Sequence, residues 1–190
     1  MKVVAFNGSA RQGGNTASML QAALAELQAA GIETELVELA GRAPGGCTAC
    51  YQCGKKKNRR CAVDNDMVND CIAKMESADG ILLGSPTYFA DLSAGMKALI
   101  ERCGMVARAN DDMFKRKVGA GVVAVRRGGA YHVFSSLNAF FLIGQMIVVG
   151  SSYWNMGFGL HPGEVGNDPE ASRTMADLGR NMAWLLQKLN

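Results

Sequence analysis

Four cysteines in one short segment could bring their sulfurs to a common metal. Cys47, Cys50 and Cys53 recur at every third residue, and seven residues separate Cys53 from Cys61. This spacing is typical of the first part of a ferredoxin clamp, in which each thiolate ligates one iron of an iron–sulfur cluster. Ala62 follows Cys61 where a ferredoxin run has proline, so all four cysteines could serve a single cluster.

Two other interpretations of this segment stay open. Four thiolates also form structural zinc sites. The segment could instead be a metal-free surface loop that forms at most a disulfide. The two remaining cysteines, Cys71 and Cys103, fall on apolar stripes of expected helices, so we interpret them as small core residues and not as ligands.

The cysteine segment also carries the basic run KKKNRR, residues 55–60. A run of this charge could attract an acidic electron-transfer partner, such as a ferredoxin-like protein, or offset the negative charge of a thiolate cluster. An ordinary solvated loop is an equally good interpretation of the same residues.

A second group of chemically suited residues is the segment Gly8–Thr16, with the sequence GSARQGGNT. Hydroxyls, an amide, glycines and the N–H groups of a helix N-terminus can bind a phosphate without a metal. The segment does not end in Gly-Lys-Ser/Thr and lacks the Gly-x-Gly-x-x-Gly spacing, which argues against nucleotide triphosphate hydrolysis and against a dinucleotide site. It predicts a monophosphate site, and the alternative is a glycine-rich turn before a helix.

Apolar periodicity predicts the elements that must position these segments. The expected strands cover residues 2–7, 34–39, 80–84, 118–125 and 146–150. The expected helices cover 15–30, a stretch capped by 64–66, a stretch that opens at 93, and then 130–145 and 170–189. Strands that alternate with helices in this way predict an α/β fold, with a five-stranded parallel sheet and helices on both faces.

Composition predicts one globular domain over residues 1–190, with the cysteine-rich loop inserted at about 41–63. A net charge of +3 is too small to indicate a nucleic-acid partner. No apolar run is long enough to span a membrane, and no signal-peptide pattern is present. Together with six cysteines, this predicts a reducing, cytoplasmic location.

The loops that follow three of the strands should meet at one edge of the sheet. Ligands of open parallel sheets bind at the carboxyl ends of the strands, near the switch point of strand order. The first of these loops is the glycine-rich segment 8–16. The second is GSPTYFADLS, residues 84–93, and the third is VRRGGA, residues 125–130.

Two of these motifs, Gly-Ser-x-Arg-x-x-Gly-Asn-Thr and Gly-Ser-Pro-Thr-Tyr-Phe-Ala-Asp, together resemble those of the flavodoxin-like NADPH-dependent FMN reductases. The Cys-x2-Cys-x2-Cys-x7-Cys motif resembles that of their iron–sulfur flavoprotein branch. The resemblance covers nearly the whole chain, including Met96–Arg102. It implies a flavodoxin-like three-layer sandwich with strand order 2-1-3-4-5.

The resemblance also implies which residues bind FMN. The FMN phosphate is assigned to Ser9, Arg11, Gly13, Gly14, Asn15 and Thr16. The isoalloxazine ring is assigned to Ser85, Pro86, Thr87, Tyr88 and Phe89. The other side of the flavin is assigned to Arg126, Gly128 and Gly129. Arg126 and Arg127 depart from the family's usual Thr- and Gly-rich loop, so they could instead contact a nicotinamide phosphate or a neighbouring subunit, or form a solvated basic turn.

The function implied by the resemblance is an FMN oxidoreductase. It would take electrons from a donor such as NAD(P)H and pass them through FMN and one [4Fe–4S] cluster on Cys47, Cys50, Cys53 and Cys61 to an acceptor. A cluster-free NAD(P)H-dependent FMN or quinone reductase and a non-enzymatic flavodoxin-type carrier are the alternatives. Flavin chemistry requires no side-chain acid or base, so no catalytic side chain is expected, and we interpret His132 and His161 as structural or solvated.

Assembly is the last expectation. The apolar segment 140–149, with Tyr153, Trp154 and Phe158, carries more apolar surface than one terminal strand should bury. Together with the resemblance, this predicts a homodimer or a homotetramer. The alternative is that these residues complete the core.

Overall fold

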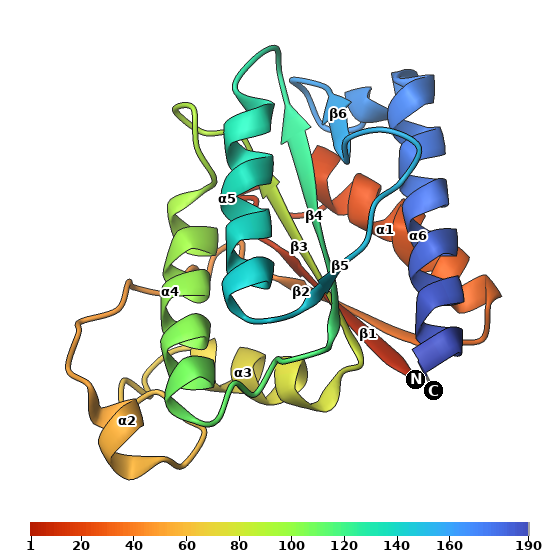
Figure 1. Cartoon of the computed structure of the whole chain (residues 1–190). Coiled ribbons are helices and arrows are strands. Elements are labelled where there is room, and N and C mark those ends of the chain that lie inside the picture. The colour runs from red at the N-terminus through yellow and green to blue at the C-terminus, as the bar shows by residue number, and fades with distance from the viewer. Residues whose placement is uncertain (190) are drawn as a thin grey trace.

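A parallel β-sheet forms the middle layer of the protein (Figure 1). The computed structural model describes residues 1–189. The strands are β1 (Lys2–Asn7), β2 (Glu33–Glu38), β3 (Gly80–Pro86), β4 (Val118–Val125) and β5 (Ile147–Val148). Their order is β2-β1-β3-β4-β5, so the predicted flavodoxin-like order is confirmed. In the register of the sheet, Ala5 lies between Leu36 and Leu82.

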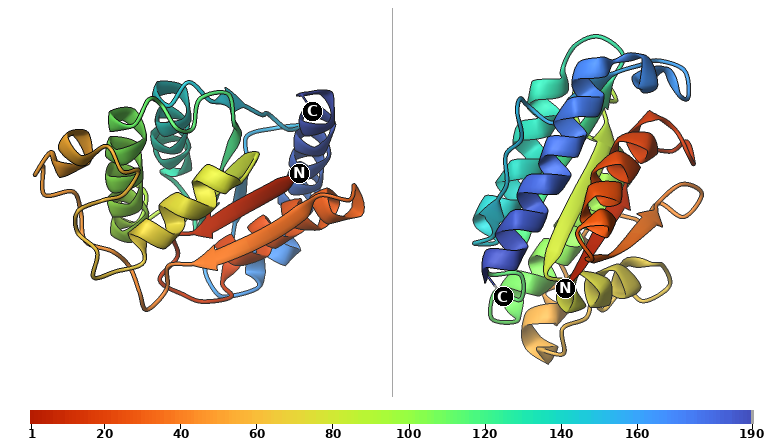
Figure 2. Two further views of the ribbon diagram at one scale, coloured as in Figure 1. Left: turned by 90° about the horizontal axis from the view of Figure 1, so that it is seen from below. Right: turned by 90° about the vertical axis from the view of Figure 1, so that its right-hand side faces the viewer.

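Helices cover both faces of the sheet, as Figure 2 shows. One face carries α3 (Val68–Ser77), α4 (Ala94–Ala109) and α5 (Ala130–Ile143), and the other carries α1 (Asn15–Ala29) and α6 (Pro169–Leu189). Because both faces are covered, every residue of β3 and β4 is buried. No helix within residues 1–189 combines the length and apolar character that crossing a lipid bilayer requires.

The outer edge of β4 is shared by two short strands. β5 pairs with the start of β4, at Val118 and Gly119, whereas β6 (Met156–Phe158) pairs with its end, at Val123–Val125. Within the described residues the sheet therefore has six strands, one more than the five expected. Of the strand expected over 146–150, only Ile147 and Val148 form a paired strand.

Asn155 explains why this edge strand is interrupted. Its side-chain Nδ2 donates to the carbonyl of Gly121 at 3.0 Å, and its backbone carbonyl accepts from the N–H of Val123 at 2.9 Å. These bonds satisfy the middle of β4 without a paired strand. Residues 149–154 can therefore leave the edge before the chain returns as β6.

The cysteine segment is more ordered than the plain loop expected over 41–63. It contains the short helix α2 (Gln52–Lys56) and packs against α4. It ends at α3, where Asp66 Oδ1 accepts from the N–H of Val68 at 3.1 Å. The N-cap of α3 is nevertheless Met67, which makes no side-chain capping bond, so the expected cap at residues 64–66 is not the one observed. A 3₁₀ turn over Glu164–Asn167 precedes α6.

Candidate cofactor sites

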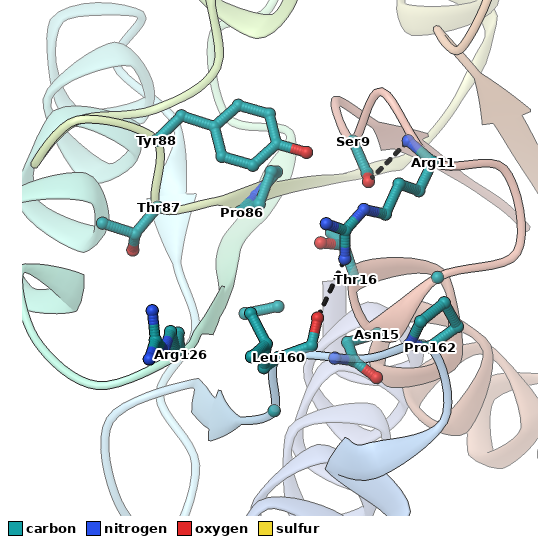
Figure 3. Close-up of a pocket in the computed structure, with 13 residues that line it drawn as sticks. Ser9, Arg11, Asn15, Thr16, Pro86, Thr87, Tyr88, Arg126, Leu160 and Pro162 are labelled. Carbon is teal, nitrogen blue, oxygen red and sulfur yellow. Dashed lines mark hydrogen bonds between the residues drawn. The ribbon is translucent and has the colours of Figure 1, made fainter.

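A cavity of about 240 Å³ lies at the carboxyl ends of β1, β3 and β4. Loops from distant parts of the chain surround it (Figure 3). It is lined by Ser9, Arg11, Gly14, Asn15, Thr16, Pro86, Thr87, Tyr88, Ala124, Arg126, Gly159, Leu160 and Pro162. The three loops expected to meet do so, and a fourth segment joins them.

The loop Ser9–Thr16, which we call the cradle, forms one end of the cavity. Asn7 Oδ1 accepts from the N–H of Ser9 at 3.0 Å, and Ser9 Oγ accepts from the N–H of Arg11 at 3.1 Å. Gly14 is the N-cap of α1 and supplies no side-chain cap. The first N–H groups of α1 therefore lack a capping side chain at the positive end of the helix dipole, which suits an anion.

Residues 159–165, here called the covering segment, lie against the cradle. Arg11 Nη1 donates to the carbonyl of Leu160 at 2.8 Å. Asn15 Nδ2 donates to the carbonyl of His161 at 2.9 Å, and Asn15 Oδ1 accepts from the N–H of Val165 at 3.3 Å. Asn15 therefore uses both polar atoms of its side chain to hold the segment. This segment was not expected to belong to the site, since its one local signal in the sequence is the turn-forming run HPG at 161–163.

Replacing Gly159 with alanine tests how closely the covering segment packs on the cradle. The added Cβ would lie 2.7 Å from Asn15 Nδ2 and 2.8 Å from the nitrogen of Val165. We expect the free energy of unfolding to fall by about 1–3 kcal/mol, measured by urea denaturation. Gly166→Ala is the matched control, since nothing lies within 4 Å of its Cβ position. Equal unfolding midpoints for the two variants would contradict this packing.

The loop after β3 forms the opposite side of the cavity. Pro86, Thr87 and Tyr88 line it, and the N–H of Thr87 donates to the carbonyl of Ala124 at 2.9 Å. Thr87 Oγ1 is buried and has no hydrogen-bond partner among the described residues. A buried hydroxyl without a partner beside a cavity suits a ligand with a polar edge. Ser85 faces away from the cavity: it is fully buried and accepts from the N–H of Ser93 at 2.9 Å.

Five of the predicted FMN-binding residues do not line the cavity. They are Gly13, Ser85, Phe89, Gly128 and Gly129. Phe89 points into solvent with a φ of +47°. Gly129, with a φ of +85°, is the N-cap of α5. Of the third loop's predicted residues only Arg126 reaches the cavity, and a role in FMN binding stays a prediction for all the assigned residues.

A second pocket, here called the cysteine pocket, lies where the cysteine segment packs on α4. It is lined by Cys47, Thr48, Ala49, Cys50, Tyr51, Cys53, Cys61, Ala62, Val63, Arg102, Met105 and Val106. All four cysteines of the predicted motif thus share one largely apolar pocket. Within residues 1–189, no three His, Cys, Asp or Glu side chains are grouped closely enough to hold a metal ion.

The thiols differ in acidity because their surroundings differ. Hydrogen bonds from the N–H of Gln52 and the hydroxyl of Thr48 lower the pKa of Cys50. Burial raises the pKa of Cys71 to about 12 and that of Cys103 well above its ordinary value. A metal is bound by thiolates, so the high pKa values of Cys71 and Cys103 make these two thiols poor ligands. This difference supports the interpretation of Cys71 and Cys103 as core residues.

Helices α3 and α4 hold the cysteine segment through side chains for which no contact with this segment was expected. Asn69 of α3 accepts from the N–H of Cys61 at 2.8 Å and donates to its carbonyl at 3.1 Å. Glu101 of α4 accepts from the N–H of Cys47 at 3.2 Å. Burial by itself would raise the pKa of Asp66. Hydrogen bonds from Arg102 and from the N–H of Val68 have the larger combined effect, so the pKa of Asp66 is lowered.

Helix α4 connects the two sites. Its N-cap, Ser93, donates through Oγ to the carbonyl of Gly8 at 2.6 Å and accepts from the N–H of Met96 at 3.2 Å. The start of α4 is therefore tied to the loop that leads into the cradle. Farther along the same helix, Arg102, Met105 and Val106 line the cysteine pocket. One rigid helix thus holds the cavity and the cysteine pocket in a fixed relation.

Comparison with known proteins gives consistent matches. A family model described as NADPH-dependent FMN reductase matches residues 1–161. An iron–sulfur flavoprotein of Methanocaldococcus jannaschii is 37% identical and covers 98% of this chain and 98% of its own. One from Methanosarcina thermophila is 31% identical, over 98% of this chain and 96% of its own. A WrbA-like flavodoxin from Agrobacterium tumefaciens has a TM-score of 0.64 at 17% identity, over 100% of this chain and 98% of its own, a likeness of fold alone.

Proposed function

Because the chain belongs to the NADPH-dependent FMN reductase family, in its iron–sulfur flavoprotein branch, we propose that it is an FMN oxidoreductase with a [4Fe–4S] cluster. NAD(P)H is the proposed electron donor, and the acceptor is a separate molecule. One observation carries the proposal: the cavity with its anion cradle and the pocket lined by four thiols are both in contact with α4.

FMN fits the cavity by its chemistry. The monophosphate of FMN can bind at the cradle, where the N-terminus of α1 has no capping side chain. Ser9, Arg11 and Thr16 lie at the cavity surface there. The opposite side offers the unpartnered hydroxyl of Thr87 to the polar edge of the ring. When bound, FMN supplies hydride acceptance and the release of electrons singly or in pairs. The protein's own part is to bind and orient the ring and to shield one side of it from water.

The lining of the cysteine pocket has the ligand chemistry that a [4Fe–4S] cluster requires. Four thiols are the usual ligand set for such a cluster, and Cys47, Cys50, Cys53 and Cys61 all line the pocket. Hydrogen bonds to the Cys50 sulfur favour the thiolate that a metal requires. A cluster accepts one electron at a time, which suits a flavin that can release its electrons singly. The four cysteines would hold the cluster, and α4 would keep it at a constant distance from the cavity.

One anaerobic purification tests this function. We expect quenching of FMN fluorescence on titration, about four irons per chain after reconstitution, and bleaching of the bound flavin by NAD(P)H. Bleaching without iron or sulfide would favour the cluster-free FMN or quinone reductase. A flavin that binds but does not react with NADH or NADPH would favour a non-enzymatic carrier. Stoichiometric zinc would replace the cluster with a structural site, and failure to bind FMN would refute the whole assignment.

Assembly into a homodimer or a homotetramer is part of this proposal. The expectation is based on the apolar segment 140–149, which is only partly buried. Phe140 and Phe141 lie in the core, whereas Leu142 and Ile143 are each 66% exposed. Tyr153, Trp154 and Phe158 are exposed as well. An exposed apolar surface of this kind suits contact with a second copy. Light scattering at micromolar concentration should give at least twice the monomer mass, and a monomer mass would refute the expectation.

An acidic electron-transfer protein of ferredoxin type is the proposed partner at the basic run 55–60. All six of its residues are exposed. Arg59 and Arg60 form ion pairs with Glu76 and Asp64, so much of their charge is compensated. The lysines at 55–57 form no ion pair within the described residues and would supply most of the attraction. A cytoplasmic location, where thiols stay reduced, completes the proposal.

A further inference from the structure

Arg102 is the charged side chain that lines the cysteine pocket, and it is almost completely buried. Its side chain is 1% exposed, in the middle of α4. Its Nε donates to the sulfur of Cys61 at 3.4 Å. Its Nη2 donates to the carbonyl of Val63 at 2.7 Å, and its Nη1 donates to the carbonyl of Gly45 at 3.3 Å and forms an ion pair with Asp66.

These bonds join both ends of the cysteine segment to one helix. Gly45 lies just before Cys47, and Val63 lies just after Cys61. The neighbouring Glu101 accepts from the N–H of Cys47. One turn of α4 therefore holds the first and the last cysteine of the motif, whatever the thiols bind.

A guanidinium in this position is costly unless it has partners, because burying a charge among apolar side chains requires compensating contacts. An apolar residue would pack on the same stripe of α4, beside Leu99 and Cys103, without that cost. Arg102 instead directs one N–H to a sulfur of the motif, and Asp66 is the carboxylate that partly neutralises its charge. This arrangement suits control of the electrostatic potential at Cys61.

We propose that Arg102 is a positioning residue that sets the reduction potential of the group held by the four cysteines. The inference rests on the proposed function, because it requires a cluster in the pocket. A hydrogen bond to a ligand sulfur and a nearby positive charge both stabilise the more negative, reduced state. Arg102 therefore raises the reduction potential of the cluster, and the carboxylate of Asp66 restrains that increase.

Two variants of opposite charge effect test this role. Arg102→Gln removes the positive charge and the N–H donors of the guanidinium, so the midpoint potential of the cluster should fall. Asp66→Asn leaves Arg102 in place and removes the compensating charge, so the midpoint should rise. Arg108→Gln is the control, because Arg108 lies on the same helix but is exposed and paired with Asp112. The midpoint is measured by anaerobic redox titration of the reconstituted protein, followed by electron paramagnetic resonance, with FMN monitored in the same sample.

Opposite shifts in the two variants, with the control unchanged, support the role. Unchanged midpoints, or shifts of the same sign, would overturn it while leaving the proposed function intact. If Arg102→Gln retains no cluster, Asp66→Asn decides alone, and an unshifted midpoint would refute the proposal. Wild-type protein that takes up no iron after reconstitution would refute the cluster itself, and this inference with it.

Discussion

Cys50→Ala is expected to abolish iron binding and to leave FMN binding unchanged. Alanine has no sulfur, so the pocket would keep only three of its four cysteines. None of the residues that line the cavity belongs to the cysteine segment, so the flavin should stay in place. Without metal the middle of the segment should become disordered or form a disulfide, because α2 has no buried residue to hold it, whereas both ends stay bonded to α4. Iron and sulfide analysis beside FMN fluorescence measures both effects.

Cys71→Ala provides the matched control for this experiment. It removes a cysteine that is buried in the core and that does not line the cysteine pocket. This variant should retain both iron and FMN, with some loss of stability from the small cavity it creates. Wild-type iron content in Cys50→Ala would contradict the assignment of the four ligands. Loss of FMN together with iron would show that the two sites depend on each other.

Arg11→Ala is expected to weaken FMN binding by about 1.5–3 kcal/mol, or roughly 10- to 150-fold in Kd. Arg11 lines the cavity at the cradle, where its charge can meet a phosphate, and the variant loses that charge-assisted contact. The same guanidinium donates to the carbonyl of Leu160, so the variant should also loosen the covering segment. Titration of FMN fluorescence measures the affinity, and urea denaturation separates the second effect from the first.

Two further variants sharpen the interpretation of Arg11. Arg11→Lys keeps the charge and loses the planar fork, so it should recover part of the affinity. Arg173→Ala removes an exposed arginine of α6 that does not line the cavity, and its affinity should equal that of the wild type. An Arg11→Ala protein that binds FMN as tightly as Arg173→Ala does would place the phosphate elsewhere.

The amino-acid sequence by itself determined the elements and the loops that carry the chemistry. Apolar periodicity located the five expected strands, most clearly the central ones, because strands buried on both faces leave short apolar runs such as Gly80–Gly84. Parallel strands bring their carboxyl ends to one edge, so the first two loops could be expected to meet, and they do at the cavity. The spacing of the four cysteines predicted that they share one metal; all four line one pocket, but within the described residues no three of them are grouped closely enough to hold a metal ion, so their ligation stays a prediction.

Only the tertiary structure decided the parts that depend on contacts between distant residues. The covering segment is held by Asn15, some 146–150 residues away in the chain, and β6 depends on bonds between Asn155 and the middle of β4. Arg102 lies on a helix whose pattern is apolar, and its partner Asp66 is 36 residues distant. Such contacts leave no local period in a sequence, because their geometry exists only after the sheet and its covering helices have packed together.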